Sequence, residues 1–164
     1  MTRVLAVSCG LLLAAFVLTA CSRDDEGVEA SASGSPAAMA SAVDPTTGLT
    51  QFELQNGVGP LAAAVRIEPG VNKQLAEKGE ELFEQKCAAC HKFSERYVGP
   101  PLADVMKRRT PTFMMNMMLN PGGMVERHPE TKKLLADFLV PMPNQGLTPE
   151  QARQVFEYLR SEIH

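Results

Sequence analysis

The run Cys87-Ala88-Ala89-Cys90-His91 is the feature that most restricts what this chain of 164 residues can fold into. Two thiols three positions apart at the end of a helical turn can reach the two vinyl groups along one porphyrin edge, and the next histidine can bind the iron. A zinc site would need further Cys or well-spaced His ligands, and a thioredoxin-like redox pair would need a βαβ setting. The sequence offers neither, so the motif predicts one covalently attached haem c with His91 as its proximal ligand.

The N-terminus has the layout of an export signal. One positive charge at Arg3 precedes an apolar run from Val4 to Ala20, which is short for a membrane span. The segment Leu18-Thr19-Ala20-Cys21 resembles the cleavage site of bacterial lipoproteins, in which the cysteine is acylated and becomes the first residue of the mature protein. The resemblance implies a signal peptide at residues 1–20 and a lipid anchor on Cys21. The alternative is an ordinary secretory signal with a chance cysteine.

Charge and composition divide the rest of the chain into two segments. Residues 21–72 carry two positive and seven negative charges, whereas residues 73–164 carry thirteen positive and twelve negative ones. The stretch 22–48 is rich in Ser, Ala, Gly and acidic residues and lacks aromatic ones, so burial cannot offset the entropy lost on ordering. We expect a flexible acidic tether at residues 21–48 and one domain at 49–164. The net charge of −3 and the absence of tryptophan exclude a basic, aromatic-laced surface for nucleic acid.

Helix start signals and apolar periodicity predict an all-α domain. Residues 50–53 (TQFE) form a capping box for a short helix, and residues 49–72 are expected to pack on the domain as an N-terminal extension. Four helices are expected in the haem-binding core, residues 73–164. They are one capped by Asn72 that runs toward Cys87, one opened by Thr110-Pro111 that ends before Asn120-Pro121-Gly122-Gly123, one that begins at His128-Pro129, and one opened by the capping box Thr148-Pro149-Glu150-Gln151. No strand has comparable support.

Residues 73–164 resemble the class I cytochrome c family over their whole length. The features that match the family's order are Gly79 and Phe83 before the haem motif, Tyr97-Val98-Gly99-Pro100-Pro101-Leu102 after it, Leu119-Asn120-Pro121, the Met142 loop, and Tyr158-Leu159 in the last helix. The resemblance implies the class I cytochrome c fold, in which helices wrap around one covalently bound haem. It also implies that the first and last helices cross closely, with Gly79 against Tyr158.

The resemblance points to two further contacts of the haem site. In the family a proline carbonyl of the Gly-Pro loop accepts a hydrogen bond from the proximal histidine, which implies Pro100 here. A basic residue just after that loop often faces a haem propionate, which implies Arg108. Lys107 and Arg109 are adjacent to Arg108, and a basic run of this kind is usually a solvated face.

The sixth ligand of the iron is predicted to be Met142. Pro141 and Pro143 disfavour helix on both sides of it, so its thioether is held on a stiff, extended loop where the family places its axial methionine. Most of the rival methionines fall on a helix, where a core role is usual: Met106, Met114, Met115, Met117, Met118 and Met124. His128 is the runner-up ligand, although a histidine that precedes proline at a helix start more often caps the helix or faces water. The terminal His164 is expected to fray.

This ligand set predicts an electron carrier and not an enzyme. His/Met ligation leaves no open iron position for oxygen or peroxide, so the protein would shuttle one electron without a small-molecule substrate. Residues 92–133 hold eight positive and four negative charges, an excess that favours acidic docking sites on redox proteins. The expected partners are a quinol:cytochrome c reductase-type donor and a terminal reductase acceptor. The expected location is the periplasmic side of a bacterial membrane, either the outer membrane or the outer face of the inner membrane.

Two other functions stay open. The haem could be five-coordinate, in a catalytic or gas-sensing protein with Met142 only structural, and the chain could be a fixed electron-entry subunit of a larger membrane reductase. The segments FELQNGVGP, YVGPPL, NMMLNPGGM and HPETKKLLADFLVPMPNQGLTPEQAR are similar to cytochromes that accompany nitrous oxide reductase systems. That similarity implies nitrous oxide reductase as the electron acceptor, with a terminal oxygen reductase as the alternative.

Overall fold

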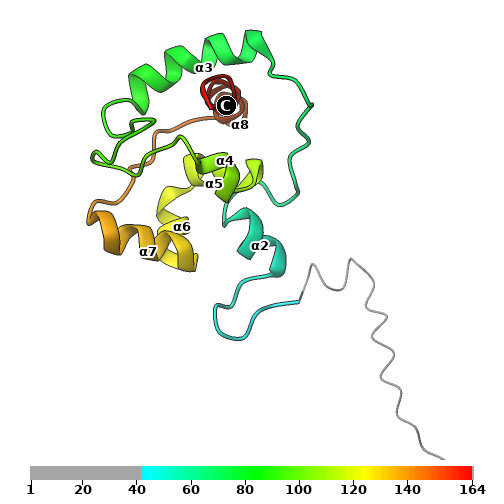
Figure 1. Cartoon of the computed structure of the whole chain (residues 1–164). Helices are drawn as coiled ribbons and strands as arrows, with labels where there is room; N and C mark the ends of the chain where they lie inside the picture. The colour runs from blue at the N-terminus through cyan, green and yellow to red at the C-terminus, as the bar shows by residue number, and fades with distance from the viewer. Residues whose placement is uncertain (1–41, 164) are drawn as a thin grey trace, which may run out of the picture. The chain divides into compact units, whose positions relative to one another are not determined.

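The computed structural model describes residues 42–163, and all of them belong to one compact unit, Gly34–His164. Seven helices form in this part of the chain: α2 (Gln51–Asn56), α3 (Lys73–Lys86), α4 (Val105–Arg108), α5 (Pro111–Leu119), α6 (Pro121–Arg127), α7 (Pro129–Phe138) and α8 (Pro149–Glu162) (Figure 1). The only β pairing within residues 42–163 is one antiparallel bridge between Val43 and Thr50. The described part of the chain is therefore all-α.

The predicted helix starts are present because each depends on local hydrogen bonds. The Asn72 side chain accepts the Leu75 amide at the start of α3, and Thr148 and Gln151 form the reciprocal capping box of α8. Such caps satisfy amides that the first helical turn leaves without an intrahelical partner. Two short helices, α4 and α6, were not predicted. α6 begins at the Asn120-Pro121-Gly122-Gly123 run, where the Asn120 side chain accepts the Gly123 amide.

The crossing of α3 and α8 organises the domain (Figure 1). At the crossing, a Cβ added to Gly79 would lie 2.0 Å from the Gln154 carbonyl oxygen and 3.0 Å from the Tyr158 Cβ, so only glycine permits this approach. The expected pairing of Gly79 with Tyr158 is found. Next to it the Phe83 ring lies 5.3 Å from the Tyr158 ring and 5.5 Å from the Phe93 ring.

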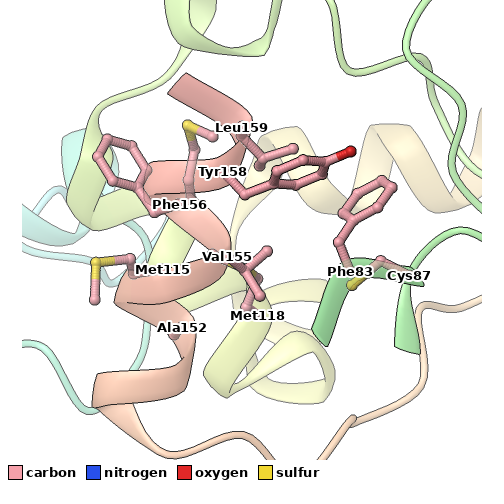
Figure 2. Packing of buried hydrophobic residues seen from close by; sticks show 10 residues of the cluster. Phe83, Cys87, Met115, Met118, Ala152, Val155, Phe156, Tyr158 and Leu159 are labelled. Carbon is pink, nitrogen blue, oxygen red and sulfur yellow. The ribbon is translucent and has the colours of Figure 1, made fainter. Parts of the chain in front are cut away.

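The main core lies between α3, α5 and α8. Figure 2 shows Phe83 and Cys87 facing Val155 and Tyr158 of α8, while Met115 lies near Phe156. Ten buried side chains form this cluster: Phe83, Cys87, Met114, Met115, Met118, Ala152, Val155, Phe156, Tyr158 and Leu159. Because Cys87 is one of them, the haem motif begins inside the core.

Residues 49–72 lie along two helices of the domain. On α5, the buried Thr112 and Asn116 side chains accept the backbone amides of Val65 and Leu61 at 2.9 and 3.0 Å. These two side chains are one turn apart, so a polar stripe on α5 holds the extension by its backbone.

The end of the extension is held by α8. The Arg160 guanidinium donates to three backbone carbonyls, those of Glu68, Pro69 and Gly70. The fully buried Glu157 carboxylate accepts the Asn72 amide at 3.1 Å and pairs with Arg153 and Arg160, both at 2.8 Å.

Residues 42–48, predicted to belong to the tether, form a turn. The Asp44 side chain accepts the amides of Thr46 and Thr47, and hydrogen bonding to Thr47 is the main cause that lowers the pKa of Asp44. The predicted signal peptide and Cys21 lie outside the described residues. Among residues 42–163, no helix has the length and apolar character needed to cross a membrane.

Candidate haem site

The haem motif follows directly from the end of α3. The Cys87 amide donates to the Phe83 carbonyl at 2.8 Å, and the Cys90 and His91 amides both donate back to the Cys87 carbonyl, at 3.0 and 2.9 Å. This tight turn places both thiols and the imidazole on one pocket. Burial among apolar groups raises the pKa of the Cys87 thiol to about 11.

The His91 ring is fixed in orientation by the loop that follows it. Its Nδ1 lies 3.1 Å from the Pro100 carbonyl oxygen, so Nδ1 donates and the Nε2 atom remains available as a ligand. A Cβ on Gly99 would lie 2.6 Å from the His91 Cε1 atom, which shows that this glycine makes room for the ring. Burial lowers the pKa of His91 and the Pro100 hydrogen bond opposes that shift; the neutral imidazole is the form that binds a metal.

The pocket around these residues is large and apolar. Its empty volume, which includes the part open to solvent, is about 1370 Å³. Aliphatic, aromatic and thioether side chains from α3, α5, α7, α8 and the loop before α4 line most of it, among them Phe83, Leu102, Met114, Leu135, Phe138 and Leu159. Cofactor sites commonly combine such a lining with a few polar groups that fix orientation. Two thiols and one oriented imidazole on an apolar pocket fit a covalently bound haem.

Met142 lines the same pocket as Cys87, Cys90 and His91. It lies in the loop between α7 and α8 and is partly buried. Three of the rival methionines, Met114, Met117 and Met118, also line the pocket from α5, whereas Met106, Met115 and Met124 do not. The Met124 sulfur is fully buried and accepts the Val58 amide at 3.0 Å.

His128 lies away from the pocket and both of its ring nitrogens are engaged. Nδ1 accepts the Glu130 amide at 3.2 Å as the cap of α7, and Nε2 lies 3.1 Å from the Leu54 carbonyl. The side chain is 1% exposed and packs edge-on against Phe113. His128 is therefore a cap that ties α7 to α2, and it does not face the iron site. The other rival, His164, lies outside the described residues.

The basic run 107–109 divides into different roles. Arg108 lines the pocket, is exposed, and donates from Nε to the Asp104 carbonyl at 3.4 Å. Arg109 also lines the pocket but pairs with Glu130 at 2.7 Å, and Lys107 pairs with Asp104 at 2.9 Å. Arg108 is thus the member of the run whose side chain has no carboxylate partner among the described residues.

Two residues at the site were not predicted. Gly99 belongs to a segment that matches the family, but its contact with the His91 ring depends on the fold of the loop. Lys86 lines the pocket, and its ammonium donates to the Gln145 carbonyl at 3.2 Å, joining the end of α3 to the loop that carries Met142. No sequence pattern signals a contact between residues 59 positions apart.

Comparison with known proteins agrees with this arrangement. The family model described as cytochrome c matches residues 76–162. Cytochrome c from Rhodothermus marinus is 44% identical to this chain with a TM-score of 0.63, and the match covers 66% of this chain and 93% of that one. An engineered cytochrome c from the same organism is 43% identical, with a TM-score of 0.62 and coverages of 66% and 94%.

A structure of the engineered protein bound to a carbene intermediate is also 43% identical, with a TM-score of 0.60 and the same coverages. No curated protein sequence matched the chain. The predicted all-α fold and the predicted haem c are confirmed by the family match and by the solved structures. Cys87 and Cys90, in the CxxCH spacing, supply the thiols for covalent attachment of the haem. The chain belongs to the cytochrome c family and is a class I, monohaem electron carrier.

Proposed function

We propose that the protein transfers single electrons through a haem c whose iron His91 and Met142 would ligate. The observation that carries the proposal is that the two thiols, the oriented imidazole and the proline-flanked thioether all line one apolar pocket. When bound, haem c supplies the one-electron iron couple. The chain then needs only to hold two ligands, exclude water and leave the haem edge within reach of partners.

The residues of the chain support such a role. The Pro100 carbonyl fixes the His91 ring and leaves Nε2 as the free nitrogen. The proline residues on either side of Met142 restrict its backbone to extended conformations, which lowers the conformational entropy lost when the thioether binds. Arg108, exposed at the pocket and without a carboxylate partner among the described residues, is suited to face a haem propionate.

The optical spectrum of the mature holoprotein tests the ligand set. A weak far-red band in the ferric form, with no response of the ferrous form to carbon monoxide, is expected from His/Met ligation. Replacement Met142→Ala should keep the haem attached, remove the far-red band and permit carbon monoxide binding. Ready carbon monoxide binding by the unmodified protein would instead favour a five-coordinate haem enzyme or gas sensor.

We propose further that Cys21 carries a lipid anchor that holds the domain on the periplasmic side of a bacterial membrane. The support is the sequence of the export signal and the acidic segment that follows it. Expression of the full chain in a bacterial host, followed by membrane fractionation, should place the protein with membranes, and Cys21→Ser should release it. If the unmodified protein and Cys21→Ser distribute equally between the membrane and soluble fractions, the lipid anchor on Cys21 is wrong.

The proposed partners are a quinol:cytochrome c reductase-type donor and a terminal reductase acceptor, with nitrous oxide reductase favoured by the sequence segments named above. The positive excess of residues 92–133 supports docking on acidic surfaces. The test is the rate at which the reduced protein is oxidised by purified nitrous oxide reductase and by a haem-copper oxygen reductase. Faster oxidation by the oxygen reductase would make it the acceptor.

A further inference from the structure

The loop that carries Met142 has few hydrogen bonds. Two of them are internal: the Gln145 side chain donates to the Pro143 carbonyl at 3.3 Å, and the Gly146 amide donates to the Asn144 side chain at 2.9 Å. Internal bonds shape the loop but do not hold it against the rest of the domain. The position of Met142 over the pocket must therefore depend on packing and on whatever contacts cross from another element.

One hydrogen bond makes that crossing. The Lys86 ammonium donates to the Gln145 carbonyl oxygen at 3.2 Å, and in the part of the chain from 42 to 163 no other hydrogen bond joins residues 140–147 to the remainder of the domain. Both residues are partly buried and both line the haem pocket. A hydrogen bond from an ammonium group is stronger than one between neutral groups, and partial burial protects it from water.

Lys86 is well placed to act as a fixed anchor. It is the last residue of α3, directly before Cys87, and α3 is held by its close crossing with α8 at Gly79. The same helix end therefore presents the first thiol of the haem motif and the donor that reaches the distal loop. A loop held at this point keeps a constant position relative to the haem attachment.

We propose that Lys86 is a positioning residue that holds the Met142 loop closed over the haem. The proposal rests on the proposed ligation of the iron by Met142. Loss of the hydrogen bond should increase the population in which the loop is open. Any ligand that competes with the thioether for the iron at high pH then binds more tightly, in proportion to that population. The far-red band should disappear at a lower pH.

The experiment is a pH titration of the far-red band in the ferric holoprotein, with three variants of the full chain. Lys86→Met removes the donor and the charge at similar side-chain length, and Lys86→Arg keeps both. Lys78→Met is the matched control, because it removes the same charge from the exposed face of the same helix. A repeat at high salt separates the hydrogen bond from long-range charge effects, which salt screens.

For Lys86→Met we expect the equilibrium constant for loss of the band to rise about tenfold, which lowers the apparent pKa of the transition by about one unit. Lys86→Arg and Lys78→Met should each stay within about 0.3 units of the unmodified protein, at low and at high salt. The rate of carbon monoxide binding to the ferrous protein should rise in Lys86→Met alone.

The outcomes separate this proposal from the one on which it rests. If the unmodified protein lacks the far-red band at every pH, ligation by Met142 is wrong. If the band is present but Lys86→Met and Lys78→Met shift its transition equally, or neither does, ligation by Met142 stands and the role of Lys86 is overturned.

Discussion

Gly79 of α3 packs directly on the backbone of α8, since a Cβ at this position would lie 2.0 Å from the Gln154 carbonyl oxygen. The contact is with backbone, so no side-chain rotation can relieve it. Gly79→Ala should lower the free energy of unfolding by about 3 kcal/mol or more, the upper end of the range for overpacked cores. Urea unfolding of the holoprotein measures the change.

The matched control for this prediction is Gly122→Ala on α6, where the added Cβ has no neighbour within 4 Å. Because alanine favours helix over glycine, this variant should be unchanged or stabilised by up to about 1 kcal/mol. Equal effects of the two substitutions would show that the crossing of α3 and α8 tolerates a side chain at residue 79.

Glu157 forms a buried ionic centre with Arg153 and Arg160 and also accepts the Asn72 amide. Glu157→Gln keeps the shape but leaves two guanidinium groups without a buried counter-charge, so we expect a loss of about 3 kcal/mol in urea unfolding. Amide exchange at Asn72 should become faster in the same variant. Lys107→Gln, which breaks the exposed pair with Asp104, should give no measurable change in either quantity.

Leu139 ends α7 in the left-handed region, with φ 61° and ψ 4°, and its side chain is 81% exposed. A residue with a Cβ is strained there, and the exposed side chain recovers little by packing. Leu139→Gly should therefore stabilise the holoprotein by about 1 kcal/mol in urea unfolding. Leu139→Ala keeps the Cβ, so its free energy of unfolding should stay within about 0.5 kcal/mol of that of the unmodified protein. If Leu139→Ala stabilises the protein as much as Leu139→Gly does, backbone strain at residue 139 is not the cause.

His128 predicts a pH dependence of stability. Burial is the main cause that lowers its pKa below the ordinary value of 6.5, with a smaller contribution in the same direction from Arg109, while the Leu54 hydrogen bond and Glu130 oppose the shift. As the pH falls, His128 therefore binds a proton in the unfolded chain before it does so in the folded one. Its contribution to the free energy of unfolding is complete above about pH 6.5 and decreases as the pH drops from 6.5 toward the pKa of the folded state.

The measurement is the free energy of unfolding of the holoprotein between pH 7.5 and about pH 5, for the unmodified chain and for His128→Asn. Asparagine keeps a capping group but does not titrate. The variant should lose part of the acid-side slope, and His91 does not disturb the comparison because the haem occupies it in both proteins. An identical slope in both proteins would show that His128 does not contribute to the loss of stability at low pH.

The helices could be predicted from the sequence because their signals are local. Asn72, Thr110-Pro111 and Thr148-Pro149 each satisfy amides within three residues, whatever the rest of the chain does. α6 was missed for the opposite reason. Its Pro-Gly-Gly start is a poor helix signal by itself. The helix is held by Met124, which is fully buried and whose sulfur accepts the amide of Val58, 66 positions away in the sequence.

The haem motif and the family were likewise determined by the sequence alone, because covalent attachment requires two thiols and an imidazole in one fixed spacing. Only the tertiary structure decided which other groups reach the pocket. It turned His128 away onto the Leu54 carbonyl and set Lys86 against the Gln145 carbonyl, whereas the contact of Pro100 with the His91 ring was already implied by the family resemblance. The His128 and Lys86 contacts join residues 74 and 59 positions apart, and both partners are backbone carbonyls. A carbonyl is present at every position of a chain, so the fold alone selects which one is used.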